Sequence, residues 1–96
     1  MEEDPVSADV SWSVAAVNPE PTRPSLSPRE VEVLRGWLRS DSKTEVAAEL
    51  FISVATVNTH LARIREKYAA VGRNAGTKAA LTARALQDGL VTLDEL

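Results

Sequence analysis

Four residues near the middle of the chain carry side chains suited to reading the edges of another molecule: Asn58, Thr59, Ala62 and Arg63. Asparagine and arginine each form two hydrogen bonds to one base edge of double-stranded DNA, and a threonine hydroxyl forms one. Alanine forms none, but it permits close approach or meets a thymine methyl group. The four residues are therefore candidates for base reading, and the alternative is an ordinary solvated helix face.

A second group of polar and basic residues is suited to holding phosphate, since hydroxyls, helix N-termini and cations all bind phosphate oxygens. The candidates are Ser42, Lys43, Ser53, Thr56, His60, Arg65, Lys67 and Arg73. Simpler roles compete with phosphate binding. Ser42 and Ser53 are equally suited to capping helices, Thr56 to supporting a helix start, and His60 to a structural position beside the first helix. Lys67 lies far along its helix.

The apolar residues of the same stretch predict the helix that positions these groups. Val57, Leu61, Ile64 and Tyr68 recur at steps of four, three and four, which places them on one helical stripe. Ser53 is the expected N-cap, and the helix is expected to continue to residue 70. One side of this helix should therefore be buried, while the candidates for base reading lie on the other side.

Three further helices are predicted around it. Capping boxes at residues 27–30 and 42–45 begin helices at residues 28–39 and 43–50, and Thr77 caps a fourth at residues 78–88 that Gly89 ends. Gly36 weakens the first of them, and a close helix crossing would explain it. Three residues join the second and third helices, which is typical of a helix-turn-helix. With no strand pattern, the predicted fold class is all-α with four helices.

Residues 1–25 hold four of the five prolines and no sustained periodicity, which predicts a linker or disordered arm before a folded domain at residues 26–96. The net charge of −3 divides into −4 for residues 1–27, +3 for residues 28–90 and −2 for residues 91–96. The positive charge is concentrated in a local patch, which favours a directed contact with a nucleic acid.

Several classes of function are disfavoured by composition. Cysteine is absent and there is one histidine, so no metal site and no cofactor are expected. No apolar run approaches the ~20 residues of a membrane span, and the acidic start lacks the basic region of a secretion signal. Residues 72–78 depart from the phosphate-loop pattern in spacing and order. We therefore expect a cytoplasmic protein without membrane contact or catalytic chemistry.

Several spaced blocks resemble the LuxR-type (GerE-like) helix-turn-helix domain, the output module of NarL/FixJ-type response regulators, from about residue 26 to residue 91. LSPREVEVL at residues 26–34 is similar to the family's L-T-x-R-E-x-E-V-L, and SKTEVA at residues 42–47 to S-N-K-E-I-A. ISVATVNTH at residues 52–60 resembles I-S-x-x-T-V-K-x-H. Ile64, Lys67 and Tyr68 resemble the later I-x-x-K-L, and Arg73 falls where the family often has arginine.

The resemblance implies that the third helix enters the DNA major groove and that the fourth pairs two protomers, with Leu81 and Ala85 as candidate dimerisation residues. The alternative for these two is packing on the first helix. The sequence departs from the family at Asn58, where lysine is usual, at Lys43 and Thr44, which replace asparagine and lysine, and at Ser40, which replaces glycine.

The resemblance therefore implies a sequence-specific transcription regulator that binds double-stranded DNA as a homodimer. No receiver domain is recognisable, so we expect the output half of a longer response regulator, with residues 1–25 as its interdomain linker; a stand-alone regulator is the alternative. A different class of function remains open, namely a small helical module that binds RNA polymerase or another regulator without contacting DNA.

Overall fold

The computed structural model describes residues 22–96, and this part of the chain consists of helices and their connections. The helices are α2 (Pro28–Ser40), α3 (Lys43–Leu50), α4 (Val54–Ala70), α5 (Lys78–Gln87) and a short 3-10 helix, η1 (Leu93–Glu95). The predicted all-α fold with four helices is confirmed. Of the predicted arm, residues 1–21 lie outside the described residues, and residues 22–25 run along the domain.

The start of α2 forms the predicted capping box. The Ser27 hydroxyl accepts a hydrogen bond from the Glu30 amide at 3.1 Å, and the Ser27 amide donates to Glu30 Oε1 at 2.9 Å. Pro28 occupies the first helical position, where the absence of an amide proton has no cost. Local sequence therefore determines where α2 begins.

We expect Ser27→Ala to lower the free energy of unfolding by about 1 kcal/mol, because the Glu30 amide loses its capping acceptor. Urea denaturation followed by circular dichroism measures the change. Ser25→Ala is the matched control, since the Ser25 side chain is exposed and only its backbone carbonyl accepts a described hydrogen bond. Equal stability of the two variants would contradict a role for the cap.

The second predicted capping box is only half formed. The Ser42 hydroxyl accepts a hydrogen bond from the Glu45 amide at 3.2 Å. The exposed Glu45 carboxylate accepts none from the Ser42 amide, so the prediction of a full capping box was wrong.

Residues with positive φ flank α3: Asp41 (61°) and Phe51 (58°). A Cβ on Gly36 would lie 3.4 Å from Val46 Cγ2, which confirms that α2 and α3 cross closely.

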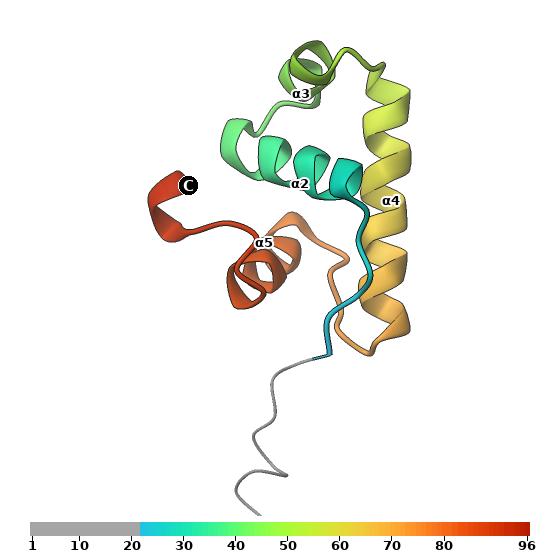
Figure 1. Ribbon diagram of the computed structural model, residues 1–96, viewed down its shortest axis with the longest axis vertical. Coiled ribbons are helices and arrows are strands. Elements are labelled where there is room, and N and C mark those ends of the chain that lie inside the picture. Colours follow the sequence, from blue (N-terminus) through green and yellow to red (C-terminus); the bar gives the residue numbers. More distant parts are fainter. Residues whose placement is uncertain (1–21) are drawn as a thin grey trace, which may run out of the picture.

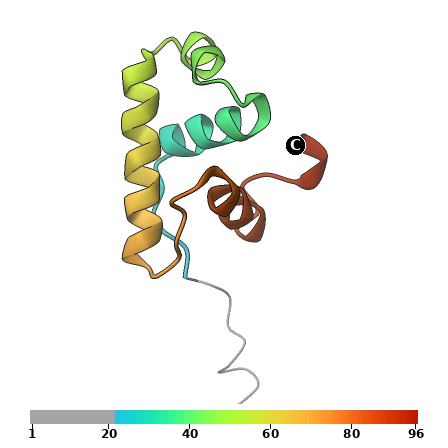
Figure 2. The same cartoon turned by 180° about the vertical axis from the view of Figure 1, so that it is seen from behind.

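The core lies where α2, α3 and α4 pack on one another, and Leu81 and Ala85 of α5 also belong to it. The predicted seam on α4 is confirmed, since Val57, Leu61, Ile64 and Tyr68 are fully buried. In Figure 1, α4 stands along one side of the molecule, with α2 and α5 on its inner side and α3 at one end. Figure 2 shows the same arrangement from behind. No other element within residues 22–96 covers the opposite side of α4.

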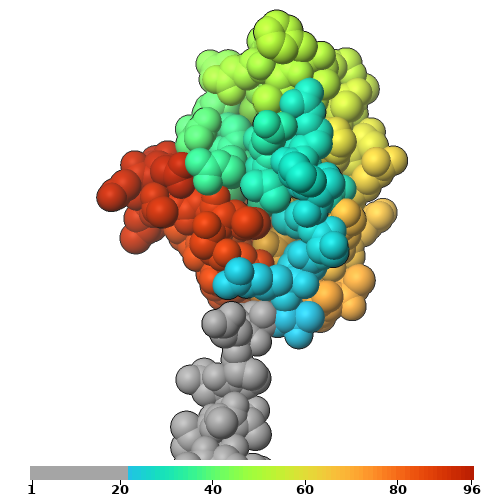
Figure 3. Space-filling model, in the orientation of Figure 1, coloured from blue at the N-terminus to red at the C-terminus, as the bar shows by residue number. Residues whose placement is uncertain are grey.

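The C-terminal tail is held by α2. Arg35 donates to the Leu90 carbonyl at 2.6 Å and to Glu95 Oε2 at 2.6 Å, and buried Val91 joins the core. In Figure 3 the tail projects beside α2, away from α4. Within residues 22–96, no helix combines the length and the apolar character that crossing a membrane requires.

Candidate nucleic-acid interface

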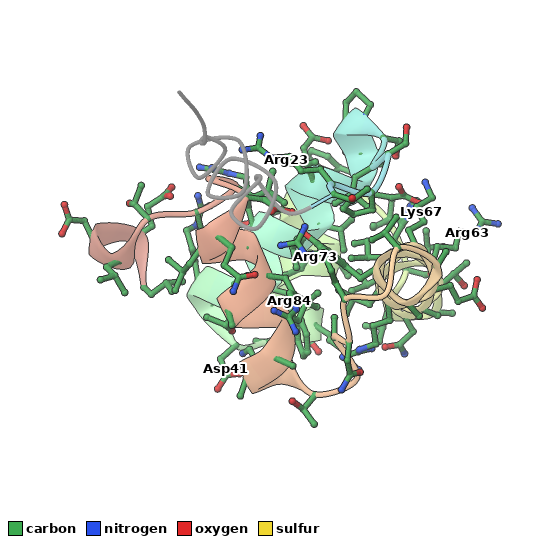
Figure 4. All side chains as sticks on the ribbon, turned by 90° about the horizontal axis from the view of Figure 1, so that it is seen from below. Arg23, Asp41, Arg63, Lys67, Arg73 and Arg84 are labelled. Carbon is green, nitrogen blue, oxygen red and sulfur yellow. The ribbon has the colours of Figure 1, made fainter. Side chains whose placement is uncertain are left out.

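The outward side of α4 presents all four residues that the sequence singled out for base reading. Asn58, Thr59, Ala62 and Arg63 are exposed, and the fully buried seam occupies the opposite side of the helix. Figure 4 looks along the molecule from below and shows Arg63 pointing away from the body of the protein. Thr59 Oγ1 donates to the Ala55 carbonyl at 3.0 Å, one turn earlier. The helix therefore offers one polar face that no other element in the described part of the chain covers.

The candidates at the helix starts are held by caps. Ser53 Oγ accepts from the Thr56 amide at 3.0 Å and lies 2.9 Å from Thr56 Oγ1, while Ser42 caps α3. Both serines thus fulfil the capping role that the sequence left open. Capping satisfies only one of the four free amides at a helix start. Backbone amides that can donate to a phosphate oxygen therefore remain at the N-termini of α3 and α4.

The two flanks of α4 carry cations that point to different neighbours. Arg65 Cζ lies 5.5 Å from the centre of the Trp37 ring, on one flank. On the other flank, Lys67 Nζ donates to Glu30 Oε1 at 2.7 Å and to the Ser25 carbonyl at 3.0 Å. Residues two apart on a helix do not share a face, which explains the separation. Polar and basic groups therefore border the outward face on both sides.

The Lys67 contact also affects Glu30. Burial by itself raises the pKa of the Glu30 carboxyl, but hydrogen bonds from Lys67 and from the Ser27 amide outweigh it, so the pKa lies below its ordinary value. Glu30 therefore remains charged and ties Lys67 to the start of α2.

His60 lies on the same flank of α4 as Lys67 and is half-buried. Its buried Nδ1 has no hydrogen-bond partner in the described part of the chain.

Arg73 lies apart from the other candidates for phosphate contact. It is 8% exposed and donates to both carboxylate oxygens of Asp88, at 2.8 and 3.1 Å. Tyr68 donates to the same carboxylate at 2.8 Å. Nη1 also donates to the Thr22 carbonyl at 2.9 Å, and Nη2 to Gln87 Oε1 at 3.0 Å. The structure thus places Arg73 in a buried ion pair that joins the end of α4 to the end of α5.

The two residues predicted for dimerisation are also buried. Leu81 and Ala85 are 0% exposed and belong to the hydrophobic core. The exposed positions of α5 are instead Ala79, Ala83 and Gln87.

The sequence missed two residues that position the interface. Arg29 Nη2 donates to the Leu50 carbonyl at 2.7 Å and so ties α2 to the end of α3, just before the turn that leads into α4. Asp88 anchors the far end of α4 through Tyr68. Both partners are distant along the chain, and no local pattern signals such pairs. α3, the turn and α4 form a helix-turn-helix in which the outward face of the second helix, α4, is exposed.

Residues 24–78 match the family described as bacterial regulatory proteins, luxR family. The chain belongs to this family. Its curated relatives include "Probable transcriptional regulatory protein NarL" of Mycobacterium tuberculosis, in the strains CDC 1551 / Oshkosh and ATCC 25618 / H37Rv. Each is 39% identical over 66 residues, which is 69% of this chain and 31% of the relative. The chain thus spans about a third of the length of these relatives. No solved structure gives a significant match.

Proposed function

We propose that this luxR-family chain is a transcription regulator that binds double-stranded DNA sequence-specifically, with α4 in the major groove. The observation that carries the proposal is the exposed polar face of α4 behind a fully buried apolar seam. A helix with its side chains is about 10–12 Å wide, and the major groove is about 12 Å wide. Membership of a family of regulatory proteins and the name of the relatives support the same function.

In this proposal Asn58, Thr59, Ala62 and Arg63 face the base edges. The phosphate contacts come from groups beside that face: Ser42, Lys43, Ser53, Thr56, His60, Arg65 and Lys67. Arg73 is left out, because its guanidinium is buried and occupied by Asp88. The phosphate contacts contribute most of the salt-dependent affinity, and the base contacts provide the preference for one sequence.

Selection of genomic DNA fragments by the purified chain, followed by sequencing, tests the proposal. A sequence-specific regulator enriches fragments with a common motif, and a duplex containing that motif binds more tightly than a scrambled duplex at the same salt concentration. Failure to enrich any fragment, with the chain shown to be folded by circular dichroism, would overturn the proposal.

A second candidate function is binding of RNA polymerase or another regulator, which one observation favours. Phe51 is 94% exposed in the turn between α3 and α4 and has a positive φ, which is strained for a bulky residue. Exposed aromatic residues are typical of protein interfaces. A chain that acts only in this way enriches no DNA fragment, so the same selection separates the two functions.

The relatives are longer than this chain, and their name suggests a place for the domain in a larger regulator. We propose that residues 26–96 are the output domain of a response regulator and that residues 1–25 are its linker. We further propose that two such domains pair through α5 on a partly palindromic site, since paired half-sites mirror a two-fold protein. The exposed small residues of α5 allow close approach of a second helix.

We expect Ala83→Glu to weaken binding to a two-half-site duplex by at least about tenfold, because like charges would face each other across the two-fold axis. Binding to a single half-site should not change. Sedimentation of the protein–DNA complex measures the number of chains bound. Thr92→Glu, at an exposed position of the tail, is the matched control. Two chains bound by the Ala83 variant as readily as by the control would place the dimer face elsewhere.

A further inference from the structure

Three cations gather around one indole beside the exposed helix. Lys78 Nζ lies 4.7 Å, Arg65 Cζ 5.5 Å and Lys43 Nζ 5.6 Å from the centre of the Trp37 ring. They come from the first residue of α5, from α4 and from the first residue of α3, while Trp37 lies on α2. We call these four residues the Trp37 cluster. All four described α-helices thus contribute to one cationic site.

The positive charge of the Trp37 cluster is poorly compensated. Lys78 pairs with the exposed carboxylate of Asp41, but neither Lys43 nor Arg65 has an ion-pair partner within residues 22–96. Lys43 and Lys78 also begin their helices, where the helix dipole is positive and lysine is disfavoured. The Nε atom of Arg65 is buried without a hydrogen-bond partner in the same part of the chain.

Attraction to the ring explains each cation by itself, but not the gathering of three. An indole attracts a cation through its face, and like charges that share a ring repel one another. A bound anion would remove this repulsion and would add charge-assisted hydrogen bonds to the lysines and the arginine. The cluster is therefore most stable when an anion is present.

The position of the cluster indicates which anion it binds. Arg65 borders the outward face of α4, and Lys43 begins the first helix of the helix-turn-helix. Lys67, on the other flank of α4, contacts Glu30 rather than Trp37. Cations thus lie on both flanks of α4: Arg65 in the Trp37 cluster on one flank and Lys67 on the other. A helix in the major groove has a phosphate backbone on each side in the same way.

We propose that the Trp37 cluster binds a backbone phosphate of DNA, so that the interface extends beyond the helix-turn-helix to Trp37 on α2 and Lys78 on α5. This inference rests on the proposed function, because it assumes that α4 meets a duplex. Lys78 has the decisive role, since it brings α5 into contact with DNA. A phosphate contact positions the domain on the duplex and reads no sequence.

The salt dependence of DNA binding by the full chain tests the cluster. The logarithm of the binding constant falls with the logarithm of salt concentration by about 0.9 for each phosphate contact on a duplex. We expect Lys78→Gln to reduce this slope by up to about 0.9, the share of one phosphate, and to do so equally on specific and scrambled duplexes. Lys43→Gln, which leaves the Asp41 pair intact, should reduce it by a similar amount.

Arg39→Gln is the matched control, because Arg39 is exposed on α2, two residues from Trp37 and therefore on another face. The salt dependence of DNA binding by Arg39→Gln should have the same slope as that of the unchanged chain. Circular dichroism verifies that all variants are folded. Unchanged slopes for both lysine variants, or an equal reduction for Arg39→Gln, would overturn the phosphate site. In those cases the unchanged chain still binds DNA, whereas failure of the proposed function is seen as no binding by the unchanged chain.

A fluorescence measurement reports on Trp37 directly. The chain has two tryptophans, and Trp12→Phe removes the other one. Addition of a scrambled duplex should change the Trp37 emission of the Trp12→Phe variant. In the double variant Trp12→Phe, Lys78→Gln, the duplex should cause a smaller change in emission. An emission unaffected by a saturating amount of duplex would count against a phosphate at the cluster.

Discussion

Asp88→Ala is expected to unfold most of the domain at 25 °C. The carboxylate accepts hydrogen bonds from Arg73 and Tyr68, and all three groups are buried. Removal of one partner leaves the charge of Arg73 buried without compensation, which costs about 3–5 kcal/mol. A core of this size rarely supplies more than about 3–5 kcal/mol of stability. Urea denaturation, followed by circular dichroism, measures the loss.

Two further variants provide reference values for the stability lost in Asp88→Ala. Tyr68→Phe removes one hydrogen bond but leaves the ion pair, so it should cost about 1 kcal/mol. Asp94→Ala removes an exposed carboxylate from the tail and should leave stability nearly unchanged. If Asp88→Ala unfolded at the same urea concentration as Asp94→Ala, the buried pair would not hold the end of α4 to α5.

The same carboxylate gives the stability of the domain a pH dependence. Burial raises the pKa of Asp88, but the hydrogen bonds from Arg73 and Tyr68 outweigh it and lower the pKa below its ordinary value. The unfolded chain therefore binds a proton at higher pH than the folded chain does. The contribution of Asp88 is complete above the ordinary value of about 3.9 and is lost as the pH falls through the lower folded pKa. Tyr68→Phe should reduce this acid sensitivity.

Local signals in the sequence were sufficient to predict the helices. Ser27, Ser42, Ser53 and Thr77 all act as N-caps, because a cap depends on residues within one turn of it. The apolar steps on α4 identified its buried side for a similar reason, since helical geometry converts spacing into a face. The second helix was predicted with its observed bounds, and the ends of the first and fourth differ by one residue.

Contacts between distant residues could not be predicted in this way. Arg73 and Asp88 are fifteen residues apart, and Lys67 and Glu30 are thirty-seven apart, so no periodicity links them. Leu81 and Ala85 followed the apolar pattern of a helix, but the pattern does not say whether the core or a second chain covers them. The Trp37 cluster depends on the relative placement of four helices, which no single segment encodes.

We expect the double variant Asn58→Ala, Arg63→Ala to lose most of the preference for the selected sequence. A bidentate contact to a base is worth about 1–3 kcal/mol. The two residues lie about 7.5 Å apart along the helix, so their effects should nearly add to about 2–6 kcal/mol. This corresponds to a loss of at least about thirtyfold in affinity for the selected duplex. Both side chains are exposed, so the fold should persist.

The ratio of affinities for selected and scrambled duplexes is the decisive measurement, because phosphate contacts contribute equally to both. The double variant should lower this ratio and leave binding to the scrambled duplex almost unchanged apart from the lost charge of Arg63. Arg39→Ala removes the same charge from α2 and should leave the ratio intact. An equal loss on both duplexes would mean that Asn58 and Arg63 contact the backbone. In that case the exposed face of α4 would hold DNA without reading it, and specificity would depend on DNA shape instead.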